Sequence, residues 1–226
     1  MIKKIYYFLH KMLSKKNERG EYSAGVWQHT VREQVIALCA QSTGKLLEVG
    51  CGEGLLLSEI AKLNHNLEIH GIDIWDEILE RAQERFKAGN IQGVKLQQAD
   101  AAKLPYADRY FDVVICINVF FNLPSDTIFR ASLKEISRVC KENAIFIFDI
   151  RNCLNPLLYF KYKLARFYDE TVANLPLRTY NFSKVQKNLA ENGFSILKKI
   201  NIGFPRNQFS PIFVIKAKKE KNKVIV

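Results

Sequence analysis

Between residues 45 and 150, short apolar runs alternate with stretches of helical periodicity. Runs of this length, rich in Val, Ile and Leu, are typical of strands buried on both faces of a parallel sheet. Strands that alternate with helices form βαβ units, which predict an α/β, doubly wound fold with helices on both faces of the sheet. The five runs are Leu46–Val49, Leu67–Ile72, Val94–Leu96, Val113–Ile117 and Ala144–Ile150, and the helical stretches between them are Gly54–Leu63, Trp75–Phe86 and Ser125–Val139.

The chain on either side of this region extends the same fold. A helix is expected from Ala24 to Ala40, and a further helix, Ser183–Asn192, precedes two closing strands near Phe194–Ile200 and Phe209–Ala217. The closing strands predict an antiparallel hairpin at the sheet edge, which brings the mostly parallel sheet to seven strands. Ser125 is an expected N-cap and Gly193 an expected C′ residue. We therefore expect one domain over residues 1–226, with a helical cover over 1–42 and an insertion over 151–181.

A glycine-rich turn, Glu48-Val49-Gly50-Cys51-Gly52-Glu53-Gly54, joins the first strand to the helix that follows it. Three glycines within five residues let the backbone come close to a ligand, and the helix that starts there offers unpaired N–H groups. The dinucleotide fingerprint G-x-G-x-x-G would need its third glycine at position 55, which is Leu55. The turn predicts a nucleotide-like ligand and disfavours a pyrophosphate.

Two carboxylates follow at the ends of the next two strands. Asp73 closes the second strand, where an acid can accept both hydroxyls of a ribose. Asp100 follows the third strand, where it can accept a hydrogen bond from an adenine amino group beside the small Ala101. Asp112 is expected to shape the turn into the fourth strand rather than to contact ligand.

With these elements in order, the stretch from Leu46 to Asp149 resembles the class I S-adenosylmethionine (SAM)-dependent methyltransferases with a Rossmann-like fold, in the branch that acts on quinones, sterols and lipids. The resemblance covers roughly half of the chain. It is carried by Leu46–Gly54, by Gly71-Ile72-Asp73, by Asp100 with Leu104-Pro105, and by Phe111-Asp112-Val113-Val114.

The resemblance implies SAM as the cofactor and a role for each matching residue. The Gly50–Gly54 backbone, with Cys51, Gly52 and Gly54, would face the methionine part of SAM, and Glu48 would support the turn or receive the amino group. Asp73 would hold the ribose, Ile74 and Ala101 would border the adenine, Asp100 would bind its edge, and Asn118 would line the floor. Relatives often carry a histidine a few residues after the fourth strand, where this chain has the segment 118–124 without one.

The sulfonium already activates the methyl group, so such an enzyme mainly aligns its acceptor and excludes water. A base is needed only when the acceptor must lose a proton. His29 and Asp149 are therefore the catalytic candidates, and the aromatic residues of the 151–181 insertion can either enclose a lipophilic or aromatic acceptor or only pack on the sheet. The candidate acceptor-binding residues are Tyr22, Arg151, Tyr159 and Tyr162.

Composition and the distribution of charge disfavour a nucleic-acid partner and a metal site. Of the net charge of +11, residues 1–20 and 216–226 supply +9, which leaves 23 basic and 21 acidic residues in the body. A nucleic-acid-binding face would need positive charge in the body, so no nucleic-acid partner is expected. The five scattered cysteines disfavour a zinc site and a disulfide framework, so no metal is expected and the cytoplasm is the simplest compartment.

The N-terminal residues 1–15 are lysine-rich and amphipathic, which predicts either a helix packed on the domain or a weak contact with a membrane surface. They do not have the pattern of a signal peptide. Three other functions stay open: an RNA or protein methyltransferase, a non-catalytic SAM-binding accessory protein, and a nicotinamide oxidoreductase. The sequence does not specify the oligomeric state or the methylated atom.

Overall fold

The computed structural model describes residues 26–168 and 176–221 of the chain. The N-terminal amphipathic segment and Tyr22 lie outside these residues. Seven strands form one sheet. In order across the sheet they are β3 (Lys95–Gln98), β2 (Leu67–Asp73), β1 (Gly44–Val49), β4 (Phe111–Cys116), β5 (Cys140–Arg151), β7 (Ile212–Lys219) and β6 (Phe194–Ile202).

The five predicted parallel strands are confirmed, since β1 pairs in parallel with β2 and β4, β2 with β3, and β4 with β5. The predicted C-terminal hairpin is also present, but the last strand is not the outermost one. β7 lies between β5 and β6 and is antiparallel to both. The apolar run Ile212–Ile215 of β7 is fully buried, whereas β6 is largely exposed from Leu197 to Lys199, so the more polar strand forms the edge.

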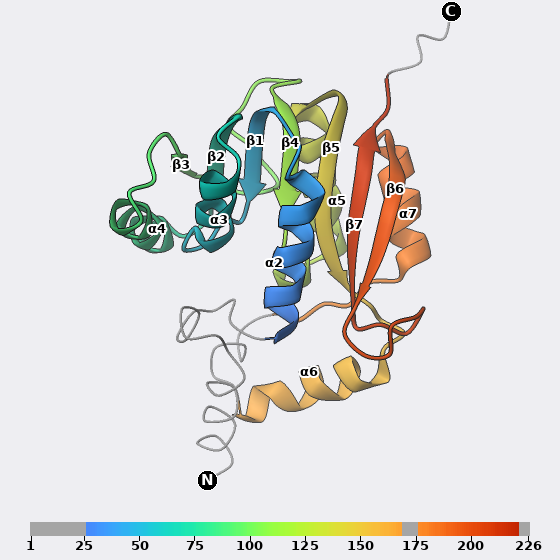
Figure 1. Ribbon diagram of the computed structural model, residues 1–226. Coiled ribbons are helices and arrows are strands. Elements are labelled where there is room, and N and C mark those ends of the chain that lie inside the picture. The colour runs from blue at the N-terminus through green and yellow to red at the C-terminus, as the bar shows by residue number, and fades with distance from the viewer. Residues whose placement is uncertain (1–25, 169–175, 222–226) are drawn as a thin grey trace, which may run out of the picture.

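Helices cover both faces of the sheet (Figure 1). One face packs against α2 (Val26–Cys39), α3 (Leu55–Leu63) and α4 (Asp76–Ala88), and the other packs against α5 (Asp126–Val139) and α7 (Phe182–Glu191). A 3-10 turn, η2 (Phe120–Asn122), follows β4, and α6 (Pro156–Tyr168) follows β5. In Figure 1, α6 lies across the end of the sheet toward which β1 and β4 point.

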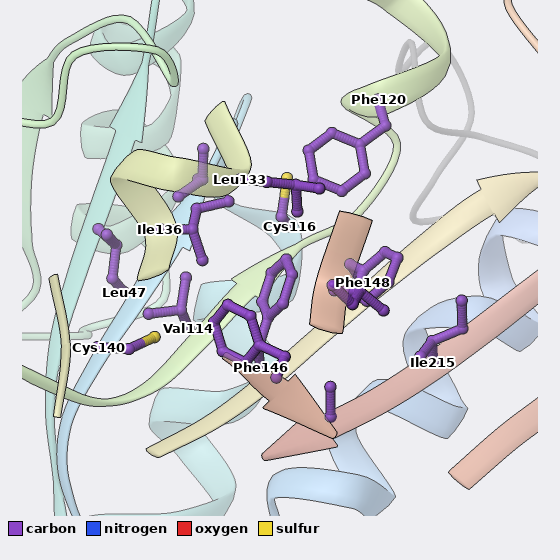
Figure 2. Close-up of a cluster of buried hydrophobic side chains, with 14 of the residues drawn as sticks. Leu47, Val114, Cys116, Phe120, Leu133, Ile136, Cys140, Phe146, Phe148 and Ile215 are labelled. Atoms are coloured by element: carbon purple, nitrogen blue, oxygen red, sulfur yellow. The ribbon is translucent and has the colours of Figure 1, made fainter. Parts of the chain in front are cut away.

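The alternation of side chains along the strands produces these two cores. In β4, Val113 and Ile115 face the α2–α3 side, whereas Val114 and Cys116 face the α5 side. Successive residues of a strand point to opposite faces of the sheet, so a strand that is apolar at every position is buried on both faces. Figure 2 shows the α5-side core, where the rings of Phe146 and Phe148 stack with their centroids 4.6 Å apart.

Both predicted helix-end residues have the expected geometry. The Ser125 hydroxyl accepts a hydrogen bond from the Ile128 amide at 3.2 Å, as an N-cap of α5 should. Gly193 follows α7 with a φ of 73°, the left-handed conformation that glycine adopts without a steric cost. Asp112 accepts a hydrogen bond from the Lys45 amide at 2.8 Å and so joins the starts of β1 and β4, which agrees with its expected structural role.

Replacing the capping hydroxyl is expected to destabilise the domain. Ser125→Ala leaves the Ile128 amide without its side-chain acceptor, which should lower the free energy of unfolding by about 1 kcal/mol. Chemical denaturation measures the loss. Thr127→Ala, in the exposed first turn of the same helix, is the matched control. An equal loss in the two variants would contradict the capping role.

Candidate functional site

The turn between β1 and α3 contains three glycines with positive φ, 74° at Gly50, 51° at Gly52 and 71° at Gly54. A Cβ at Gly50 would lie 2.2 Å from the Val119 side chain, and one at Gly54 would lie 2.7 Å from Phe86. Around Gly52, by contrast, a Cβ would meet no heavy atom within 4 Å. The outer glycines are therefore needed for packing, whereas Gly52 presents bare backbone to open space, as a close approach by a ligand requires.

Asp73 lies directly beside this turn. Its Oδ2 accepts a hydrogen bond from the Gly52 amide at 2.9 Å, and its Oδ1 accepts one from the Trp75 amide at 3.1 Å. The amides of Gly50 and Cys51 both donate to the Ile72 carbonyl at 2.8 Å. The structure thus brings the predicted glycine turn and the predicted ribose-binding acid together. The next side chain, Ile74, is 53% exposed at this edge.

The Cys51 side chain is a packing group. It is buried, and burial raises the pKa of its thiol well above the usual range. A thiol of this kind stays protonated at neutral pH and is a poor nucleophile. Cys51 therefore contributes to the site through its backbone in the glycine turn and not through its thiol.

Asp100 lies on the loop that follows β3. The side chain is exposed, and its Oδ1 accepts a hydrogen bond from the Ala102 amide at 2.8 Å, while Ala101 packs against the α5-side core. Farther along, Arg138 of α5 donates to the carbonyls of Leu104 at 3.0 Å and Tyr106 at 2.7 Å. This arginine fastens the loop that carries Asp100 to the body of the domain.

Glu48 closes β1 beneath the glycine turn and is only 2% exposed. Burial, and secondarily the nearby charge of Asp73, raise the pKa of this carboxyl well above its ordinary value, although Arg32 opposes the shift. The Glu48 Oε2 is buried and has no hydrogen-bond partner. A buried acceptor without a partner is costly, so this oxygen is suited to a donor on a bound ligand.

Arg32 on α2 is a site residue that the sequence analysis missed. It is 2% exposed and acts electrostatically on Glu48. It is next to Val31, which with Val35 and Cys39 forms the buried stripe of α2. Its position beside the buried stripe was the only sequence signal that Arg32 is buried, because no motif surrounds this arginine.

A buried polar cluster lies at the carboxyl ends of β4 and β5. Asp149 accepts a hydrogen bond from the Asn118 amide at 2.7 Å and forms an ion pair with Arg151, both partners being almost fully buried. Arg151 also donates to the Asn118 Oδ1 at 2.7 Å and lies over the ring of Phe121 at 4.4 Å. Asn118 itself has a φ of 58°. The predicted floor residue, one catalytic candidate and one acceptor-binding candidate are therefore a single connected unit.

The remaining candidates lie in different places. Tyr162 is on the sheet-facing side of α6, close enough to Arg151 that the two affect each other's pKa, and burial raises the pKa of the tyrosine. Tyr159 is 59% exposed on the outer side of that helix. His29 is on α2, where its Nε2 lies 2.9 Å from Oε1 of Glu33. The structure thus joins Tyr162 to the Asp149–Arg151 pair but does not join Tyr159 or His29 to it.

The arrangement fits an adenosine-containing cationic ligand better than a metal. It offers an open glycine backbone, a carboxylate at the end of β2 and a buried acceptor on Glu48. Within residues 26–168 and 176–221, no three His, Cys, Asp or Glu side chains gather to form a metal site.

Comparisons with known proteins agree with this geometry. A family model described as a methyltransferase domain matches residues 40–193. A phosphatidylethanolamine N-methyltransferase of Cereibacter sphaeroides is 29% identical over 150 residues, which are 65% of this chain and 71% of that protein. A demethylmenaquinone methyltransferase of Staphylococcus aureus is 32% identical over 138 residues, 60% of this chain but only 55% of that protein.

The fold is similar to that of a solved methyltransferase. The crystal structure of magnesium protoporphyrin IX methyltransferase from Synechocystis, with S-adenosylhomocysteine bound, aligns with a TM-score of 0.67 at 20% identity. The alignment covers 85% of this chain and 83% of that one.

Asp73→Asn is expected to weaken SAM binding by roughly 1.5–3 kcal/mol, the scale of a hydrogen bond to a charged group, or about 10- to 150-fold in Kd. The physical reason is the loss of the carboxylate charge that would accept both ribose hydroxyls. Titration calorimetry measures the affinity. Asp76→Asn, in the exposed first turn of α4, should bind SAM like the wild type. An unchanged affinity of the Asp73 variant would refute the assignment.

Glu48→Gln is expected to flatten the pH dependence of stability. Because the pKa of Glu48 is raised in the folded protein, its protonated form is preferred there. The resulting stabilisation is complete below the ordinary value of 4.5 and is lost as pH rises through the raised pKa. Urea unfolding between about pH 5 and about pH 8 should therefore show a decline in the wild type and a smaller decline in the variant.

The exposed Glu77→Gln variant is the control for this measurement and should keep the wild-type decline. If the stability of the Glu48 and Glu77 variants declines with pH as steeply as that of the wild type, the inference that the pKa of Glu48 is raised is wrong.

Proposed function

The chain belongs to the SAM-dependent methyltransferases, and we propose that it transfers the methyl group to a small lipophilic acceptor that binds beside the Asp149–Arg151 pair. The observation that carries the proposal is the edge formed by the glycine turn, Asp73 and Asn118, with α6 lying across it (Figure 1). Bound SAM supplies an activated methyl group on a sulfonium.

In this proposal, the residues of the chain bind and orient the cofactor. Asp73 accepts the ribose hydroxyls, Asp100 accepts from the adenine amino group, and Ile74 and Ala101 border the adenine. Glu48 accepts from the amino group of the methionine part. Gly50, Cys51, Gly52 and Gly54 supply a backbone on which that part lies. The open space around Gly52 and the unpartnered oxygen of Glu48 support these roles.

The Asp149–Arg151 pair is proposed to hold Asn118 in position, and not to abstract a proton from the acceptor. Both carboxylate oxygens of Asp149 are already engaged, one by the Asn118 amide and the other by the Arg151 guanidinium. Both members hold Asn118, one through its amide and one through its side chain. They would thereby fix the floor of the site while Arg151 and Tyr162 face the acceptor. His29 is then the proposed base for an acceptor that must lose a proton.

A lipophilic acceptor is supported from two directions. The acceptors named for the two relatives are phosphatidylethanolamine and demethylmenaquinone, both of which are lipophilic. In this chain the segment that crosses the carboxyl-end edge, α6, begins with the sequence Pro-Leu-Leu-Tyr-Phe and contains no acid. We propose that residues 151–181 form part of the acceptor's cover.

An assay with tritiated SAM and fractionated cell extract tests the acceptor class. The label is expected in the solvent-extractable lipid fraction, and mass spectrometry then identifies the product. His29→Asn should lower turnover by about 100-fold or more if the acceptor needs a base, whereas the exposed His65→Asn should not.

Three other results would each overturn a defined part of the proposal. Label that appears only in RNA or protein would refute the lipophilic acceptor. SAM binding without label in any fraction would favour a non-catalytic accessory role. Turnover that His29→Asn leaves unchanged would remove the proposed base.

A further inference from the structure

Large apolar side chains are exposed on α6, in the turn just before it, and on the loop between β6 and β7. Phe204 is 78% exposed in that loop, and Leu157 is 61% exposed on α6. Soluble monomers rarely expose several large apolar groups next to one another without an interaction partner. The full set is Leu154, Leu157, Tyr159, Phe160, Phe204 and Phe209, which we call the aromatic edge.

Hydrogen bonds hold the two segments of the aromatic edge together. Asn152 donates through its Nδ2 to the carbonyls of Gln208 and Ser210, both at 2.9 Å, and Asn155 donates to the Phe209 carbonyl at 2.6 Å. Both asparagines are 1% exposed. The start of α6 and the 203–209 loop are therefore fixed side by side, as Figure 1 also shows, and both segments carry exposed apolar side chains.

Helix α6 has a buried side that faces the domain and an exposed side that contributes to the aromatic edge. Leu158 is 1% exposed and faces the domain, whereas Leu157, Tyr159 and Phe160 are exposed. The Tyr159 and Phe160 rings contact each other edge to face, with centroids 5.7 Å apart. A side chain of the opposite side, Tyr162, reaches Arg151. The exposed residues are thus not needed to hold α6 on the domain.

The charged side chains of the two segments that form the aromatic edge, residues 150–163 and 202–211, are all basic. Lys163 and Arg206 are exposed next to its apolar members, whereas Lys161 lies over the Trp27 ring at 5.1 Å, and the two segments contain no Asp or Glu. Amphipathic surfaces with aromatic and Leu side chains bordered by Lys or Arg bind the boundary between headgroups and acyl chains. Anionic headgroups attract such basic residues. Charge complementarity therefore favours an anionic lipid surface over a neutral one.

We propose that the aromatic edge docks the protein on an anionic lipid bilayer. Leu157, Phe160 and Phe204 would enter the interface, while Lys163 and Arg206 would lie at the level of the phosphates. Among the described residues, no helix is both long enough and apolar enough to cross a bilayer. The two segments that carry the docking surface lie at the end of the sheet toward which β1 and β4 point, beside the end of β5 (Figure 1). The inference does not depend on the identity of the acceptor.

Vesicle sedimentation of the full chain tests the proposal. The wild type should sediment with phosphatidylcholine vesicles that contain phosphatidylglycerol, and less with pure phosphatidylcholine or at high salt. Phe160→Glu and Phe204→Glu should each weaken this partitioning about tenfold or more, because each replaces a buried apolar contact with a repelled charge. Leu63→Glu is the matched control, since Leu63 is 70% exposed on α3, outside the aromatic edge, and it should bind like the wild type.

Thermal unfolding should show that the variants stay folded, as expected for exposed positions. Vesicle binding that both aromatic-edge variants retain in full would overturn the proposal, as would an equal loss in the Leu63 variant or no binding by the wild type. Sedimentation velocity provides a further outcome. If the wild type is a dimer that Phe160→Glu dissociates, and it binds no vesicles, the surface joins two copies of the chain instead.

Discussion

Burial of the central strands on both faces is the constraint that decides where this protein can carry its chemistry. β1 and β4 are apolar along most of their length because helices cover each side of the sheet. A polar group inside such a strand would be left without water or a partner, which is costly. In β1 and β4, the polar side chains therefore stand near the strand ends. Since the strands run parallel, those ends meet at one edge, where Glu48, Asp73 and Asp149 lie.

The carboxylates at this carboxyl-end edge of the sheet have two different environments. Asp73 is a surface-accessible carboxylate that braces the glycine turn through the Gly52 amide and remains available to a ligand. Asp149 is almost completely buried and ion-paired with Arg151, so its charge stabilises the local backbone instead. Removing one partner of a buried pair leaves an uncompensated charge, which makes such a pair rigid. The rigid pair fixes Asn118 in a left-handed conformation that non-glycine residues rarely adopt.

The segment after β5 connects this rigid cluster to the outside of the molecule. Tyr162 on the inner side of α6 reaches Arg151, while Leu157 and Phe160 on the outer side are exposed. One helix thus contacts the Asp149–Arg151 pair on its inner side and carries part of the aromatic edge on its outer side. This arrangement links the two proposals structurally: an acceptor that partitions into a bilayer would meet the protein at the side on which the methyl donor binds.

The sequence by itself determined the elements whose signals are local. Alternating apolar runs predict the parallel strands because backbone periodicity depends only on neighbouring residues, and Gly50–Gly54, Asp73 and the Ser125 cap follow from short motifs with a steric or hydrogen-bonding reason. Only the tertiary structure decided which distant side chains meet. Arg32 on α2 acts electrostatically on Glu48 of β1, Arg138 fastens the loop after Asp100, and β7 enters between β5 and β6. Tyr159 and Tyr162 are three residues apart, yet they face solvent and site respectively, because the packing of α6 decides which side is buried.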